Sequence, residues 1–74
     1  MVVMMVYGGN LRGFVFKLKD KYTFKIYHVQ NGKRSIVFES ANRYTSKSEC
    51  YHTLRLDLAD LLGIDEGLLS VKRM

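Results

Sequence analysis

Cysteine and histidine, the residue types that most often act as nucleophiles, bases or metal ligands, form only one close pair in this 74-residue chain. Cys50 and His52 lie two residues apart in a segment whose pattern predicts a helix. Side chains two apart on a helix point about 200° away from one another. The pair therefore cannot share a metal ion or act as nucleophile and base, and Cys50 is predicted to be a small core residue.

The other titratable residues also lack a catalytic or metal-binding pattern. No residue near His28 in the sequence completes such a set, so a structural role at the rim of a sheet is expected. Carboxylates gather around the predicted helix end, at Asp57, Asp60, Asp65 and Glu66. There they oppose the helix dipole, and a solvated acidic rim or a partner contact fits them better than acid–base chemistry. The sequence thus predicts a non-enzymatic protein without catalytic residues, metal ion or cofactor.

Charge is the property that points towards a partner. Twelve Lys and Arg residues against seven Asp and Glu give a formal charge of +5, whose sign favours nucleic acid. The candidate nucleic-acid-binding residues are Lys17, Lys25, Lys33 and Tyr27 on the sheet face opposite the predicted core, with Arg34 at the rim. Such a face could contact phosphates and stack bases with little sequence preference. The competing interpretation is that lysines only solvate the open face of an antiparallel sheet.

Three segments that alternate apolar and polar side chains would position these residues. Residues 14–18, 22–29 and 33–40 predict an antiparallel meander, with a turn at 19–21 and a hairpin loop around an Asn-Gly pair. The predicted core face carries Phe14, Phe16, Phe24, Ile26, Ile36 and Phe38. In this meander Phe16 lies beside Phe24, and Phe14 beside Ile26.

The loop of the hairpin decides how its strands pair. A two-residue turn at Asn31 and Gly32 would pair Tyr27 with Ile36 and mix the core and solvent faces. A three-residue loop that includes Gln30 gives glycine the left-handed bulge position instead. That loop pairs Ile26 with Ile36, and Phe24 with Phe38, so it is the predicted arrangement.

The segment 46–62 predicts a helix that covers the core face of the sheet. Ser46 and Glu49 have the spacing of a capping box, and Gly63 supplies the end. One arc of this helix is apolar, with Cys50, Tyr51, Leu54, Leu58, Leu61 and Leu62. Leu56 points away from the arc, either as a single exposed leucine or as part of a second contact.

The predicted fold class is α+β, a three- to four-stranded antiparallel meander with one amphipathic helix on one face. Residues 1–74 form a single domain, with a core module at 12–63, an N-terminal strand and turn at 1–10 and a tail at 64–74. Within the tail, Leu68 to Val71 could add an edge strand or a partner contact. Residues 1–7 are apolar but too short to cross a membrane, so they are predicted to form a buried strand, and no membrane association is expected.

The size of the chain predicts self-association. A chain this small has a marginal core, and its single cysteine excludes an internal disulfide, so a homodimer is expected. The reduced cysteine also indicates a cytoplasmic setting. The predicted interface residues are Val2, Met4 and Val6 on the N-terminal strand and Leu56 on the helix. A second candidate function is a protein-interaction regulator or inhibitor, of the kind encoded by phages and mobile elements, that uses this apolar edge and the acidic helix end.

Over residues 14–58 the chain resembles the YegP-like family of small strand-strand-strand-helix repeats. The matching residues are Phe14, Phe16, Tyr22, Phe24, Asn31, Gly32, Ile36, Ser40, Tyr44, Ser46, Lys47, Cys50 and Leu54. The resemblance implies a three-stranded antiparallel sheet covered by one helix, with single-repeat members pairing as dimers. It implies no reaction and supplies no catalytic or binding residues.

Overall fold

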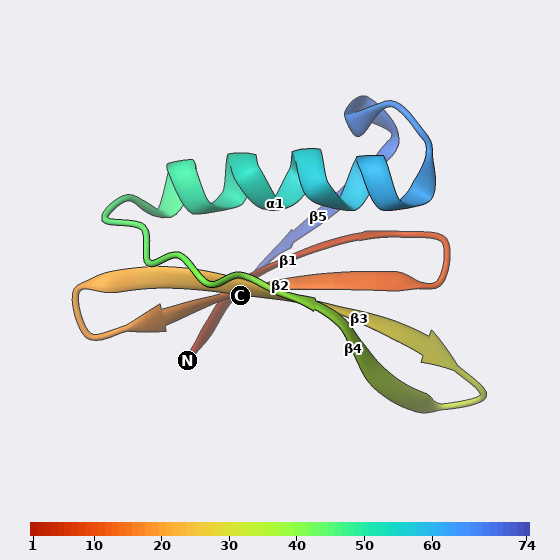
Figure 1. Cartoon of the computed structure of the whole chain (residues 1–74), viewed down its shortest axis with the longest axis horizontal. Helices are drawn as coiled ribbons and strands as arrows, with labels where there is room; N and C mark the ends of the chain where they lie inside the picture. The colour runs from red at the N-terminus through yellow and green to blue at the C-terminus, as the bar shows by residue number, and fades with distance from the viewer.

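One antiparallel sheet and one helix make up the structure, a computed structural model that describes residues 1–74 (Figure 1). The strands are β1 (Val2–Gly8), β2 (Leu11–Leu18), β3 (Lys21–Gln30), β4 (Lys33–Glu39) and β5 (Ser70–Arg73), and the helices are α1 (Lys47–Leu62) and the short 3₁₀ helix η1 (Glu66–Leu68). The strand order is β4-β3-β2-β1-β5. The predicted α+β class is confirmed, with five strands in place of three or four.

Strands β2 and β3 pair one residue out of the predicted register. Phe14 lies opposite Lys25, and Phe16 opposite Thr23, so the predicted pairs with Ile26 and Phe24 are wrong. The turn between the strands contains only two residues, because Leu18 already pairs with Lys21. Since side chains alternate between faces, this one-residue difference sends Phe14 and Phe16 to the face away from the helix.

The hairpin of β3 and β4 also differs from the prediction, because its turn has two residues. Asn31 and Gly32 have φ angles of 53° and 77°, and Tyr27 lies opposite Ile36. The register then shifts at a bulge, so that Phe38 lies opposite Ile26. The bulge adds one residue to β4 between these two pairs. Ile36 therefore lies on the face away from the helix, whereas Phe38 lies on the core face.

The core lies between α1 and the sheet. Phe24 is 1% exposed, which confirms it as a core residue. The buried apolar residues are Met4, Val6, Leu11, Val15, Phe24, Ile26, Cys50, Leu54, Leu58 and Ala59. The ring of Phe38 stacks on that of Phe24 at a centroid distance of 5.8 Å. Three residues predicted for this core face the other side: Phe14, Phe16 and Ile36.

Helix α1 has the predicted ends. The Ser46 hydroxyl accepts a hydrogen bond from the Glu49 backbone N–H at 3.3 Å, and Gly63 adopts a φ of 67° that ends the helix. Leu56 is exposed, as expected, but Leu61 is 53% exposed and does not belong to the buried arc. The structure has no helix that is long and apolar enough to span a membrane.

The N-terminal strand is in the interior of the sheet. β1 pairs with β2 on one side and with β5 on the other. The tail therefore adds an edge strand, at Ser70–Arg73 and not at the predicted Leu68–Val71. Met4 and Val6 are buried against α1, with 3% and 0% exposure, and the prediction that they form a dimer interface is wrong. Val2 lies opposite Phe16 on the uncovered face. The free edges of the sheet are β4 and β5.

Candidate nucleic-acid interface

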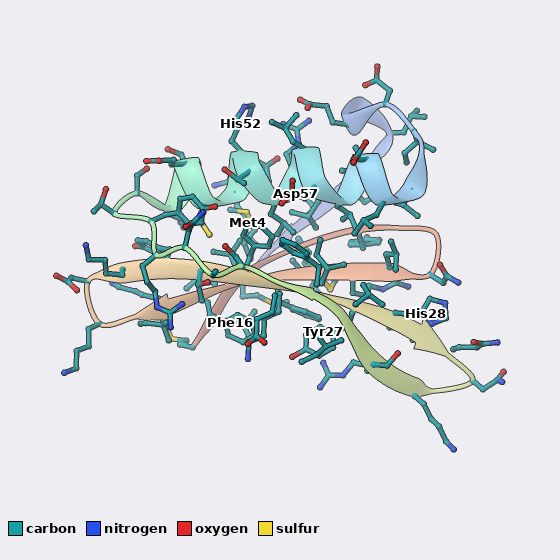
Figure 2. All side chains as sticks on the ribbon, viewed as in Figure 1. Met4, Phe16, Tyr27, His28, His52 and Asp57 are labelled. Carbon is teal, nitrogen blue, oxygen red and sulfur yellow. The ribbon has the colours of Figure 1, made fainter.

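The sheet face that α1 leaves uncovered is rich in aromatic side chains. Figure 2 shows Phe16 and Tyr27 projecting from the sheet on the side away from the helix, whereas Met4 lies between sheet and helix. The alternation of strand side chains produces this division, since the neighbours of the buried Val15 and Ile26 must point the other way. We call the set Tyr7, Phe14, Phe16 and Tyr27 the aromatic face.

The rings of the aromatic face contact one another across strands β2 and β3. Phe14 meets Tyr27 edge-to-face, with ring centroids 5.7 Å apart and an interplanar angle of 74°. Phe14 also lies 6.5 Å from the ring of Phe16. All three side chains are half-buried, so each keeps part of its ring surface accessible to a ligand.

Cationic side chains lie over these rings. The Arg34 guanidinium is 5.0 Å from the ring centroid of Tyr27 and 5.9 Å from that of Phe14. The Lys25 ammonium lies 5.4 Å from the Phe16 centroid, and the Arg12 guanidinium 5.3 Å from that of Tyr7. Such cation–π contacts hold positive charge beside a flat aromatic surface. An unpaired base stacks on a surface of this kind, and its phosphate is neutralised by a nearby cation.

Of the predicted binding residues, the structure brings Lys25, Tyr27 and Arg34 together on this face. Lys25 also forms an ion pair with Glu39 at 3.4 Å. The placement predicted for Lys17 and Lys33 is wrong. Both follow the alternation of the helix side, since Lys17 lies two residues after the buried Val15, and Lys33 pairs with Gln30 at the hairpin tip.

The prediction missed Arg12, Phe14 and Phe16 as members of this face. They alternate in β2 with Gly13 and Val15, which are buried. The signal was present as an arginine and two phenylalanines at a spacing of two. The two phenylalanines are predicted for the core because phenylalanine is usually buried, whereas the smaller Gly13 and Val15 lie under the helix here.

The histidines and the cysteine do not form a site. His28 lies at the rim, with its Nε2 atom 2.8 Å from Asn10 Nδ2. His52 points away from the sheet on the outer side of α1 (Figure 2). Cys50 is fully buried, and its burial, together with the neighbouring Glu49, raises the pKa of its thiol to about 11. The thiol therefore stays protonated and unreactive at neutral pH.

An acidic groove lies between α1 and the edge strand β4. It is lined by Phe38, Asp57, Asp60 and Leu61. Burial, and secondly the charge of Asp60, raise the pKa of the Asp57 carboxyl above its ordinary value. The ion pairs of the structure are Lys25–Glu39 and Arg55–Glu66, so both carboxylates in the groove lack a basic partner. No group of three or more His, Cys, Asp and Glu side chains could hold a metal ion.

The chain matches no protein-family model, and no curated protein or solved structure is significantly similar to it. The resemblance to the YegP-like family therefore stays a prediction from the sequence. A functional assignment rests on the geometry of the aromatic face and the charges around it.

Proposed function

We propose that the protein binds single-stranded nucleic acid without marked sequence preference, through the aromatic face and the cations over it. The observation that carries the proposal is the arrangement of Arg34 over both Tyr27 and Phe14 beside the Lys25–Phe16 pair. Rings of this kind stack unpaired bases, and the cations neutralise the adjoining phosphates.

The aromatic content favours single strands over duplex. A ring can stack on a base only if the base is unpaired, because the faces of paired bases are already occupied by their neighbours. Every base has a flat apolar face, and Lys25 acts as a flexible point charge, so little sequence preference is expected. The net charge of +5 would speed association with any polyanion.

The test is a binding titration with fluorescein-labelled oligo-dT and oligo-U of about 15 nucleotides, followed by anisotropy over a salt series. The double variant Lys25→Gln/Arg34→Gln should weaken binding at least tenfold, because it removes two phosphate contacts. Each contact contributes about 0.7 to the slope of the logarithm of affinity against the logarithm of salt concentration. Lys17→Gln/Lys47→Gln is the matched control. It removes the same charge from side chains off the aromatic face and should change affinity less than threefold.

A second arm tests stacking independently of charge. Tyr27→Leu keeps an apolar side chain but removes the ring, and should weaken binding by about 1 kcal/mol or more, the effect of one lost base–aromatic stack. Binding should also quench the tyrosine fluorescence of the wild type, and less so that of Tyr27→Leu. Equal losses in both charge variants, with no effect of Tyr27→Leu, would show general polyanion attraction and overturn the proposal.

The second candidate is a protein-interaction regulator that acts through the acidic groove and the apolar edge beside it. The observation in its favour is the pair of unpartnered carboxylates, Asp57 and Asp60, next to the exposed Phe38 and Leu61. If the wild type bound neither oligonucleotide at about 50 mM salt, where phosphate contacts are strong, the nucleic-acid proposal would fail and this candidate would replace it.

A further inference from the structure

The edge strand β4 exposes three consecutive apolar side chains in its middle, between the charged residues Lys33, Arg34 and Glu39. Ile36, Val37 and Phe38 are 51%, 47% and 41% exposed, and the other side of the strand pairs with β3. Edge strands of soluble proteins usually carry a charge or a proline in such a run, because an unprotected edge pairs with another strand. None occurs between Ser35 and Phe38.

The backbone of β4 is suited to accept a strand. In a hairpin with a two-residue turn, the residues that flank the turn, Gln30 and Lys33, form a hydrogen-bonded pair. Hydrogen-bonded and non-hydrogen-bonded pairs alternate along an antiparallel ladder. The N–H and C=O groups of Arg34 and Ile36 therefore point away from β3, towards the free edge.

We propose that β4 pairs antiparallel with β4 of a second copy, about a two-fold axis at Ser35. Arg34 of each copy then lies opposite Ile36 of the other, and the outward backbone groups of these residues bond to each other. The small Ser35 side chains meet at the axis, where little bulk opposes close approach. This dimer does not depend on nucleic-acid binding, and its interface differs from the N-terminal strand.

Charge complementarity identifies a second copy as the occupant of this edge. In the paired arrangement, Lys33 of one copy follows the Arg34–Ile36 pair and lies beside the bulge residue Val37 of the other, with its side chain on the helix side. The acidic groove beside Phe38 is then within reach of that lysine, and its carboxylates, Asp57 and Asp60, have no basic partner within the chain. Each copy thus supplies both the apolar edge and the cation that the groove of the other lacks.

The second free edge is less suited to pairing. β5 spans only Ser70–Arg73, and its cations, Lys72 and Arg73, leave it no run of three apolar side chains like that of β4. The proposed pairing closes with two copies, because the same strand is used on both sides. An interface of one short strand is small, so a dimer of micromolar affinity is expected.

Sedimentation equilibrium of the full chain, from about 1 to 500 μM, tests the proposal across the range expected of a small interface. The wild type should pass from monomer to dimer, and Ile36→Lys should remain monomeric. Leu56→Lys is the matched control, since Leu56 is 46% exposed and the change adds the same charge on α1. This variant should dimerise as the wild type does, because Leu56 lies outside the proposed interface.

A covalent trap provides the second test. A Ser35→Cys variant should form a disulfide-linked dimer under mild oxidation, because facing residues of a non-hydrogen-bonded pair lie close enough for a disulfide. Ser48→Cys, an exposed serine on α1, should stay largely monomeric. The native Cys50 is fully buried and does not compete.

Exchange of charges tests the proposed role of the groove. Lys33→Asp and Asp60→Lys should each weaken the dimer at least threefold, and the double variant should recover most of the affinity. The proposal is wrong if the wild type is monomeric throughout, if Leu56→Lys and Ile36→Lys have equal effects, or if Ser35→Cys is trapped no faster than Ser48→Cys. If the double variant does not recover affinity, Lys33 of one copy does not contact the acidic groove of the other, and a second copy is not the occupant of this edge.

Discussion

The side chain of Leu54 lies directly on Gly13, in the middle of β2. A Cβ atom at position 13 would lie 2.5 Å from Leu54 Cδ1, much closer than two carbon atoms can approach. Gly13 is opposite Val6 on one side and Ile26 on the other, so this gap is at the centre of the sheet. The helix can pack against the sheet at this distance only because position 13 has no side chain.

Gly13→Ala should therefore destabilise the protein. The added methyl group overpacks a tight contact, and the free energy of unfolding should fall by about 1–3 kcal/mol in urea denaturation. In a Leu54→Ala background the same change should cost much less, because the leucine methyl groups that it meets are gone. An equal cost in both backgrounds would contradict this explanation of the glycine.

Lys19→Asn should stabilise the protein. Lys19 has a φ of 55°, a left-handed conformation that lysine adopts at a cost and asparagine tolerates. An increase in the free energy of unfolding of about 0.5–1 kcal/mol is expected from urea denaturation. Asp20→Asn, in the same turn but without a positive φ, is the control and should give little change. Equal gains from both would point to the general preference of asparagine for turns, and not to the positive φ at position 19.

Cys50 should make stability depend on alkaline pH. Burial raises the pKa of its thiol from 9.0 to about 11, so the unfolded chain loses this proton at a lower pH than the folded one. Stability is therefore lost as the pH rises from about 9 to about 11, by about 2–3 kcal/mol for a shift of this size. Cys50→Ala should show a shallower decline over the same range. Parallel curves for both proteins would assign the decline to other groups.

Asp57→Asn should increase stability at neutral pH. The pKa of Asp57 is raised above 3.8 by burial and by Asp60, so the ionised carboxylate disfavours the folded state. The free energy of unfolding falls as the pH rises from about 3.8 through the raised pKa of the folded state. The asparagine variant has no carboxyl group there and does not show this loss. Denaturation should be measured below about 1 μM protein, under the dissociation constant expected for the dimer, so that the chain is monomeric. The gain should vanish near about pH 3, where the carboxyl is protonated in both states; a gain that persists there would have another cause.

The elements of the fold could be predicted from the chain. Periodicity and capping predicted α1 to within a residue, with Ser46 and Gly63 at its ends. Both hairpins were placed in the right part of the chain, but each turn has two residues where three were predicted. These features depend on neighbours in the sequence, since a cap or a turn is formed by a few adjacent residues. Three of the five predicted binding residues, Lys25, Tyr27 and Arg34, also lie on one face.

The orientation of the strands towards the helix was decided by the tertiary structure. The sequence determines that Phe14 and Phe16 share a face and that Gly13 and Val15 share the other, because side chains alternate in any strand. Either set could face the helix. The close packing of Leu54 on Gly13 leaves no room for phenylalanine there, so the rings turn outward, where they meet Tyr27 and Arg34. A contact between residues 41 positions apart cannot be read from local pattern, and it determines which face is the core and which is the candidate binding surface.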